Sequence, residues 1–71
     1  MTDVKFLAVL GDRIKMLRQK KGMTQTELAM LCKFEKASMS RIEAGKTNIT
    51  VATLLKISKA LDLEITEFFK D

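Results

Sequence analysis

Apolar residues recur every three or four positions along much of this chain, which is the spacing of one face of an α-helix. This spacing predicts a first helix from residue 4 or 6 to residue 20. Gly22 stands where a residue in the left-handed conformation closes a helix, and Gly11 weakens the middle. The apolar stripe of this helix comprises Phe6, Leu10, Ile14 and Leu17.

A second helix is marked by its start, in the segment "MTQTEL" at residues 23–28. Thr24 and Glu27 are three residues apart, so each side chain can accept a hydrogen bond from the backbone N–H of the other. This capping box predicts a helix over Gln25–Cys32. We expect it to bury Leu28, Leu31 and Cys32.

Three further helices are predicted after the second. One runs from residue 36 to 44 and is stopped by Gly45, and the next begins after the N-cap Thr50 and ends near residue 61. A final turn or two spans residues 65–69. We therefore expect an all-α fold, a five-helix bundle that forms one domain over residues 1–71. One face of the fourth helix carries Val51, Leu54, Leu55, Ser58 and Leu61.

The composition fits a helical domain in a reducing compartment. The 71 residues include no proline and three glycines, and 46% are apolar, which is too many for a disordered chain with a net charge of +4. The single cysteine, Cys32, cannot form an internal disulfide, and we assign it to the core. No apolar run is long enough for a secretion signal or a membrane span. We expect a cytoplasmic protein with no membrane partner.

Positive charge is concentrated in one part of the chain. Residues 13–46 hold nine Lys or Arg and three acids, whereas residues 49–71 hold three Lys and four acids. A polyanion would dock on the basic part, and a solvated lysine-rich surface is the alternative.

The predicted third helix has an unusual outer face. At 100° per residue, Met39 and Ile42 point to one side, and the opposite arc of about 140° contains no acid. Solvated helix faces usually mix Glu with Lys. Cations with small and hydroxyl side chains suit a helix that enters a groove and donates hydrogen bonds. The residues of this arc are Lys36, Ala37, Ser40, Arg41 and Ala44.

Three motifs in this order resemble the Cro/CI-type, or XRE, family of helix-turn-helix domains over residues 13–69. They are "LRQKKGMTQTELA" at 17–29, "SMSRIEAGK" at 38–46 and "LLKISKALDL" at 54–63. The resemblance implies a lambda-repressor-like fold whose second and third helices form the helix-turn-helix. The third, at about residues 36–44, would be the recognition helix in the major groove.

The resemblance also implies roles for individual residues. Arg18 and Glu43 match a structural ion pair between the first and third helices. The positions from which such proteins read base edges match Lys36, Ala37, Ser40 and Arg41. The positions that contact the DNA backbone match Gln25, Ser38, Lys46, Thr47 and Asn48.

The chain departs from the family pattern at the turn. Lys33 stands where a left-handed glycine is common, which costs roughly 1 kcal/mol if that geometry is kept. Glu35 replaces the usual Ser, Thr or Asp cap of the recognition helix, and "TNIT" replaces a common "NP" before the fourth helix.

Other residues have structural interpretations. Arg13 and Lys15 are expected to be solvated. Of the adjacent phenylalanines, Phe68 is assigned to the core, whereas Phe69 and Ile65 are assigned to a dimer interface.

The predicted function is a sequence-specific, double-stranded-DNA-binding transcriptional regulator that acts as a homodimer on a palindromic operator. No enzyme, cofactor or metal site is expected, because the chain has no His, no activated nucleophile and no ligand cluster. The alternatives are a helical protein-interaction adaptor and, within the regulator class, a phage-type repressor or an antitoxin-type regulator. The "NIT" loop and the long first helix favour a restriction-modification controller protein. RNA polymerase or another protein is a further candidate partner.

Overall fold

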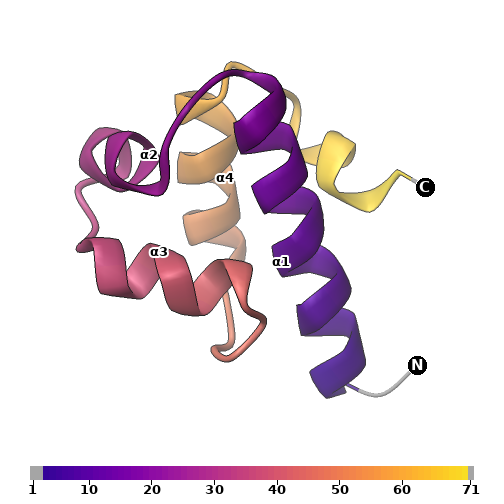
Figure 1. Ribbon diagram of the computed structural model, residues 1–71. Helices are drawn as coiled ribbons and strands as arrows, with labels where there is room; N and C mark the ends of the chain where they lie inside the picture. Colours follow the sequence, from indigo (N-terminus) through magenta and orange to yellow (C-terminus); the bar gives the residue numbers. More distant parts are fainter. Residues whose placement is uncertain (1–2, 71) are drawn as a thin grey trace.

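The computed structural model describes residues 3–70, which form an all-helical fold (Figure 1). The described residues form four α-helices: α1 (Asp3–Lys20), α2 (Gln25–Cys32), α3 (Lys36–Glu43) and α4 (Val51–Ala60). The prediction of an all-α fold is confirmed, but the count of five α-helices is wrong. The last element, Ile65–Phe69, is a 3₁₀-helix in which the N–H of Glu67 bonds the carbonyl of Glu64 at 3.0 Å. Five residues without a side-chain cap are too few to sustain an α-helical ladder.

The predicted helix-turn-helix pair lies on one side of α1, and the 3₁₀-helix lies on the other (Figure 1). α2 packs against both α3 and α4, while α3 also packs against α1. No helix within residues 3–70 is both long and apolar enough to cross a membrane.

The capping chemistry that defined the helix starts is confirmed. Thr24 Oγ1 accepts from the N–H of Glu27 at 3.1 Å, and Glu27 Oε1 accepts from the N–H of Thr24 at 3.0 Å. This bond from the Thr24 backbone holds the pKa of Glu27 below its ordinary value. Thr50 caps α4, whereas Glu35 makes no side-chain cap for α3. Lys33 keeps the left-handed turn geometry, with φ of 60°.

The core contains side chains from every helix, but it excludes some apolar residues that the spacing pattern predicts to be buried. Leu31 is 58% exposed, so its expected burial is wrong, and Ala29 is buried instead. Leu31 lies about 110° from the centre of the arc formed by Leu28, Ala29 and Cys32, which turns it to solvent. Cys32 is in the core as predicted. The largest fully buried side chains are Phe68, Ile14, Leu28, Met39, Ile57 and Leu61.

Two apolar stripes extend beyond this core. Phe6 is 42% exposed, because the first turns of α1 reach past the rest of the bundle (Figure 1). On the predicted face of α4, Leu54, Ser58 and Leu61 are buried, whereas Val51 and Leu55 are exposed.

Gly11 has a role that its low helix propensity did not indicate. A Cβ at this position would lie 2.5 Å from the carbonyl oxygen of Ile42 and 2.6 Å from that of Glu43. Contacts this short are forbidden, so only glycine lets α1 approach the backbone of α3 so closely. Glycine at this mid-helix position therefore allows α1 to pack closely against α3, the candidate recognition helix.

The 3₁₀-helix is bonded to α1. Phe68 is fully buried and Phe69 is 48% exposed, as predicted, while Ile65 is partly buried against the core. The expectation that Arg13 is solvated is wrong. Arg13 is half-buried, and its Nη1 donates to the carbonyl oxygen of Phe68 at 3.1 Å.

Candidate nucleic-acid interface

The outward side of α3 is exposed and carries no acid. The helix turns its own acid, Glu43, into the interior, together with Met39 and Ile42. The exposed side can therefore present cations and hydroxyls to an anionic groove without a competing carboxylate from the same helix. It holds all four predicted base-reading residues, Lys36, Ala37, Ser40 and Arg41.

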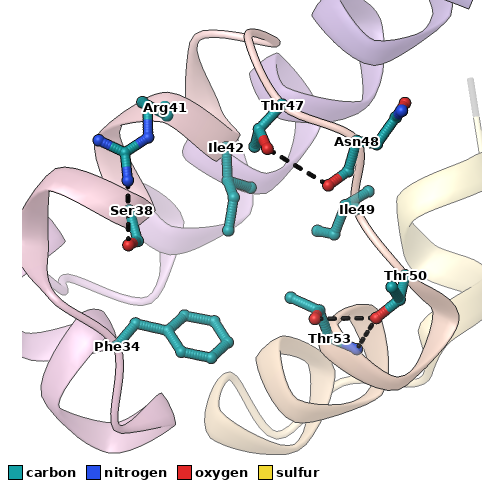
Figure 2. Close-up of a pocket in the computed structure, with 9 residues that line it drawn as sticks. All are labelled: Phe34, Ser38, Arg41, Ile42, Thr47, Asn48, Ile49, Thr50 and Thr53. Carbon is teal, nitrogen blue, oxygen red and sulfur yellow. Dashed lines mark hydrogen bonds between the residues drawn. The ribbon is translucent and has the colours of Figure 1, made fainter.

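A hollow of about 260 Å³ adjoins this side of α3, between the helix, the following loop and the start of α4 (Figure 2). Its rim brings together Ser38 and Arg41 of α3 with Thr47 and Asn48 of the loop. Arg41 Nη2 donates to Ser38 Oγ at 3.3 Å, and the Thr47 hydroxyl donates to the carbonyl oxygen of Asn48 at 3.4 Å. One predicted base-reading residue, Arg41, therefore shares this rim with three predicted backbone-binding residues.

Sequence reasoning missed the part of this rim that belongs to α4. The hydroxyls of Thr50 and Thr53 lie 3.0 Å apart there, and both line the hollow (Figure 2). The spacing of a capping threonine and a second threonine one turn later could have indicated them. The floor is apolar and includes Phe34, whose ring lies 5.6 Å from Lys56 Nζ.

Lys46 does not line this hollow. It lines a separate depression between Val4 and Leu7 of α1 and the loop that follows α3. The loop end is held by the C-terminal cap of α3, in which the N–H of Lys46 bonds the carbonyl of Arg41 at 3.0 Å. Lys46 is exposed, so it extends the cationic surface beyond α3.

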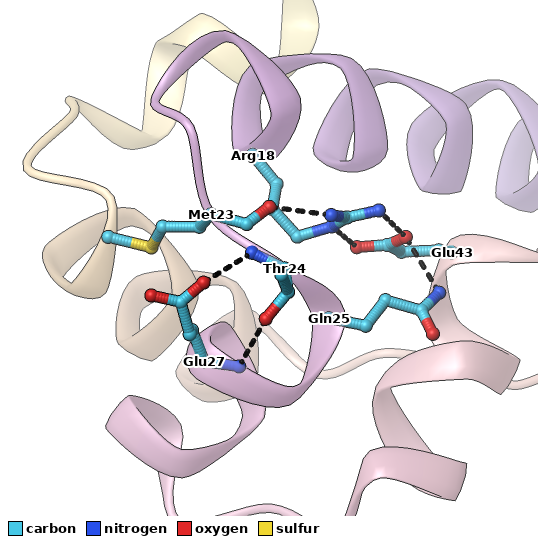
Figure 3. A network of polar contacts seen from close by, with 6 residues as sticks. All are labelled: Arg18, Met23, Thr24, Gln25, Glu27 and Glu43. Carbon is cyan, nitrogen blue, oxygen red and sulfur yellow. Dashed lines mark hydrogen bonds and ion pairs between the residues drawn. The ribbon is translucent and has the colours of Figure 1, made fainter.

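Arg18, Glu43 and Gln25 form one polar network between α1, α3 and α2 (Figure 3). Arg18 Nε and Nη2 donate to Glu43 Oε2 and Oε1 at 2.7 and 3.0 Å, and both residues are 7% exposed. Gln25 Nε2 donates to Glu43 Oε1 at 3.0 Å. The third arginine nitrogen, Nη1, donates to the carbonyl of Met23 at 2.7 Å. The pairing of Arg18 with Glu43 matches the expectation, but the bond to Gln25 was not predicted.

The described residues offer little for metal or thiol chemistry. Residues 3–70 contain no group of three or more His, Cys, Asp or Glu side chains that could hold a metal ion. Burial raises the pKa of the Cys32 thiol, which opposes formation of the reactive thiolate.

The geometry is that of two short helices in sequence, with an exposed, acid-free second helix and a polar loop beside it. The sequence profile of the helix-turn-helix family matches residues 14–68, which include all of this surface. The chain belongs to this family. The helix-turn-helix pair is α2 and α3, with Lys33 in the turn between them.

Among relatives of this helix-turn-helix chain, control protein C.MunI from Mycoplasma sp. is 33% identical over 72 residues, covering 100% of this chain and 95% of that protein. Antitoxin HipB from Escherichia coli K12 is 37% identical over 57 residues, 80% of this chain, but the chain spans only 65% of HipB. The crystal structure of the restriction-modification controller protein C.AhdI from Aeromonas hydrophila superposes with a TM-score of 0.86 at 35% identity. That superposition covers 89% of this chain and 96% of C.AhdI.

Proposed function

We propose that this helix-turn-helix protein is a transcriptional regulator that binds double-stranded DNA sequence-specifically and has no catalytic activity. The observation that carries the proposal is the orientation of α3, with every acid of the helix buried and every predicted base-reading residue exposed. Membership of a helix-turn-helix family supports the same class. We propose the cytoplasm, in association with the nucleoid, as its location.

The proposed readout assigns α3 to the major groove. Lys36 and Arg41 donate to guanine O6 and N7, Ser40 pairs with a base edge of either kind, and Ala37 contacts a thymine methyl. The exposed bond from Arg41 to Ser38 in the free protein spans one helical turn, so these two side chains, both proposed to contact DNA, lie side by side.

The proposed backbone contacts come from the start of α2 and from the rim of the hollow. Polar side chains at these places donate to phosphate oxygens and fix the register of α3 without reading sequence. Lys46 is the only cation among them, so it alone adds to the salt dependence of binding. The residues are Gln25, Ser38, Lys46, Thr47 and Asn48.

We propose that two copies bind together through Ile65 and Phe69. A 71-residue chain buries a small core, so a partner subunit adds stability. Phe69 is 48% exposed beside the partly buried Ile65, which leaves apolar surface for a second copy. Two recognition helices one duplex turn apart, ~34 Å, read a palindromic operator.

Within the regulator class we propose a restriction-modification controller. The chain matches C.MunI and C.AhdI over nearly the whole length of each, whereas HipB is longer than the match. An antitoxin-type regulator is the second candidate, since the identity to HipB is 37%. RNA polymerase or another protein remains a candidate partner at the promoter.

The direct test is selection of bound duplexes from a random pool by the purified protein. We expect one enriched sequence with two inverted half-sites. Recovery of duplexes without any shared sequence would contradict the proposal and favour a protein-interaction adaptor.

A further inference from the structure

The carboxylate of Glu43 does more than complete an ion pair. Its Oε1 accepts two hydrogen bonds, from Arg18 Nη2 in the interior and from Gln25 Nε2 near the surface, each at 3.0 Å (Figure 3). Gln25 is the first residue of α2 and is half-buried. Glu43 therefore links the interior of the protein to a side chain at the proposed DNA-binding surface.

This bond selects one orientation of the Gln25 amide. An amide nitrogen carries two donors and an amide oxygen only accepts. Turning the amide over would place its oxygen against the carboxylate oxygen, two acceptors in contact, so the nitrogen is held on the side of Glu43. One of its N–H groups serves Glu43, which leaves the second to donate to another acceptor.

The charge of Glu43 does not stand in the way of an anion. Arg18 binds both carboxylate oxygens in a fork, at 2.7 and 3.0 Å, so the pair is neutral overall. Arg18 Nη1 also donates a hydrogen bond to the carbonyl of Met23, two residues before Gln25. The carboxylate can thus orient the amide without repelling a phosphate next to it.

We propose that Glu43 is a positioning residue for DNA binding: through Gln25, it sets an amide N–H toward a backbone phosphate. The inference rests on the proposed function, because Gln25 must face DNA for the orientation to matter. It assigns to the buried ion pair a role in affinity that is separate from its role in folding.

The test is a double-mutant cycle on the duplex enriched by selection. In the natural chain, Gln25→Ala should weaken binding about tenfold, the effect of one hydrogen bond to a charged group. The second background is Arg18→Met/Glu43→Met, which removes the acceptor but keeps the interior apolar and filled. There the amide can turn freely, and Gln25→Ala should weaken binding by less than about threefold.

Glu27→Gln provides the matched control. Glu27 is an exposed carboxylate in the same turn of α2, and it bonds Thr24 rather than Gln25. Gln25→Ala should keep its full tenfold effect in that background. Circular dichroism would establish that each variant is folded. If the variant with the Met pair is not folded, Arg18→Leu/Glu43→Leu replaces it, since it also removes the acceptor and leaves no unpaired charge in the interior.

The outcomes separate the two proposals. A natural chain that binds no duplex overturns the proposed function. If the natural chain binds and Gln25→Ala has the same effect in both backgrounds, or none in either, this inference is overturned and the proposed function stands. The inference is supported if Gln25→Ala weakens binding tenfold in the natural chain and in Glu27→Gln, but less in the background that lacks Glu43.

Discussion

Gly45 packs its backbone directly onto that of Ala8, so the turn that follows α3 contacts α1 with no side chain between them. A Cβ on Gly45 would lie 2.6 Å from the Cα of Ala8 and 2.7 Å from its nitrogen. Gly45 also has φ of +72°, in the left-handed region. It therefore satisfies two conditions that only glycine meets, one of conformation and one of space.

We expect Gly45→Ala to destabilise the protein more than Gly22→Ala does. Gly22 has nearly the same φ, +74°, but nothing lies within 4 Å of a Cβ there. Both substitutions incur roughly 1 kcal/mol of left-handed strain, and Gly45→Ala adds a backbone clash worth at least ~1–2 kcal/mol more. Urea unfolding of the two variants measures the difference, and equal losses would show that the close packing is not there.

We expect Lys33→Gly, in contrast, to stabilise the protein. Its φ of 60° places a side chain in the left-handed region at the turn between α2 and α3. Lys33→Gly should raise the free energy of unfolding by roughly 0.5–1 kcal/mol. The control is Asp62→Gly, at φ of 56°. Aspartate tolerates this region better, so the gain should be smaller there. Thermal unfolding that ranks the two the other way round would contradict the strain argument.

The helix boundaries could be predicted because capping is local. Thr24 and Glu27 are three residues apart, and the chemistry that joins them is visible in the sequence. The bond between Gln25 and Glu43 spans 18 positions. It depends on how α2 and α3 pack, which no local pattern specifies. The exposed side of α3 was predictable from periodicity alone.

The wrong burial of Leu31 and the missed role of Gly11 have the same origin. Leu31 is wrongly expected in the core, and the packing role of Gly11 is missed, because periodicity and propensity describe one helix at a time. Leu31 faces away from the core and is 58% exposed, and Gly11 is required by the close approach of the α3 backbone. Tertiary contacts decide both positions.

Phe69→Asp should abolish dimer formation if the proposed interface is correct. A charge placed among desolvated apolar side chains disrupts an interface. Phe6→Asp is the matched control, because Phe6 is 42% exposed and Phe69 48%, and Phe6 is outside the proposed interface. Sedimentation equilibrium should find a monomer only for Phe69→Asp. A dimer that survives this change would exclude Phe69 from the interface.

In the proposed complex, α3 reads bases while the loop after it binds the DNA backbone. Arg41 and Lys46 are both exposed cations, and the cap of α3 joins their backbones at 3.0 Å. They are close in the chain and equal in charge, so they differ chiefly in the groups that they are proposed to contact.

The most direct measurement compares the affinities of Arg41→Ala and Lys46→Ala for the selected duplex and for a scrambled duplex over a range of salt concentrations. Arg41→Ala should reduce the discrimination between the duplexes by about 1–3 kcal/mol. Lys46→Ala should weaken both equally and reduce the slope of log K against log salt concentration by about one. An equal loss on both duplexes for Arg41→Ala would contradict the account.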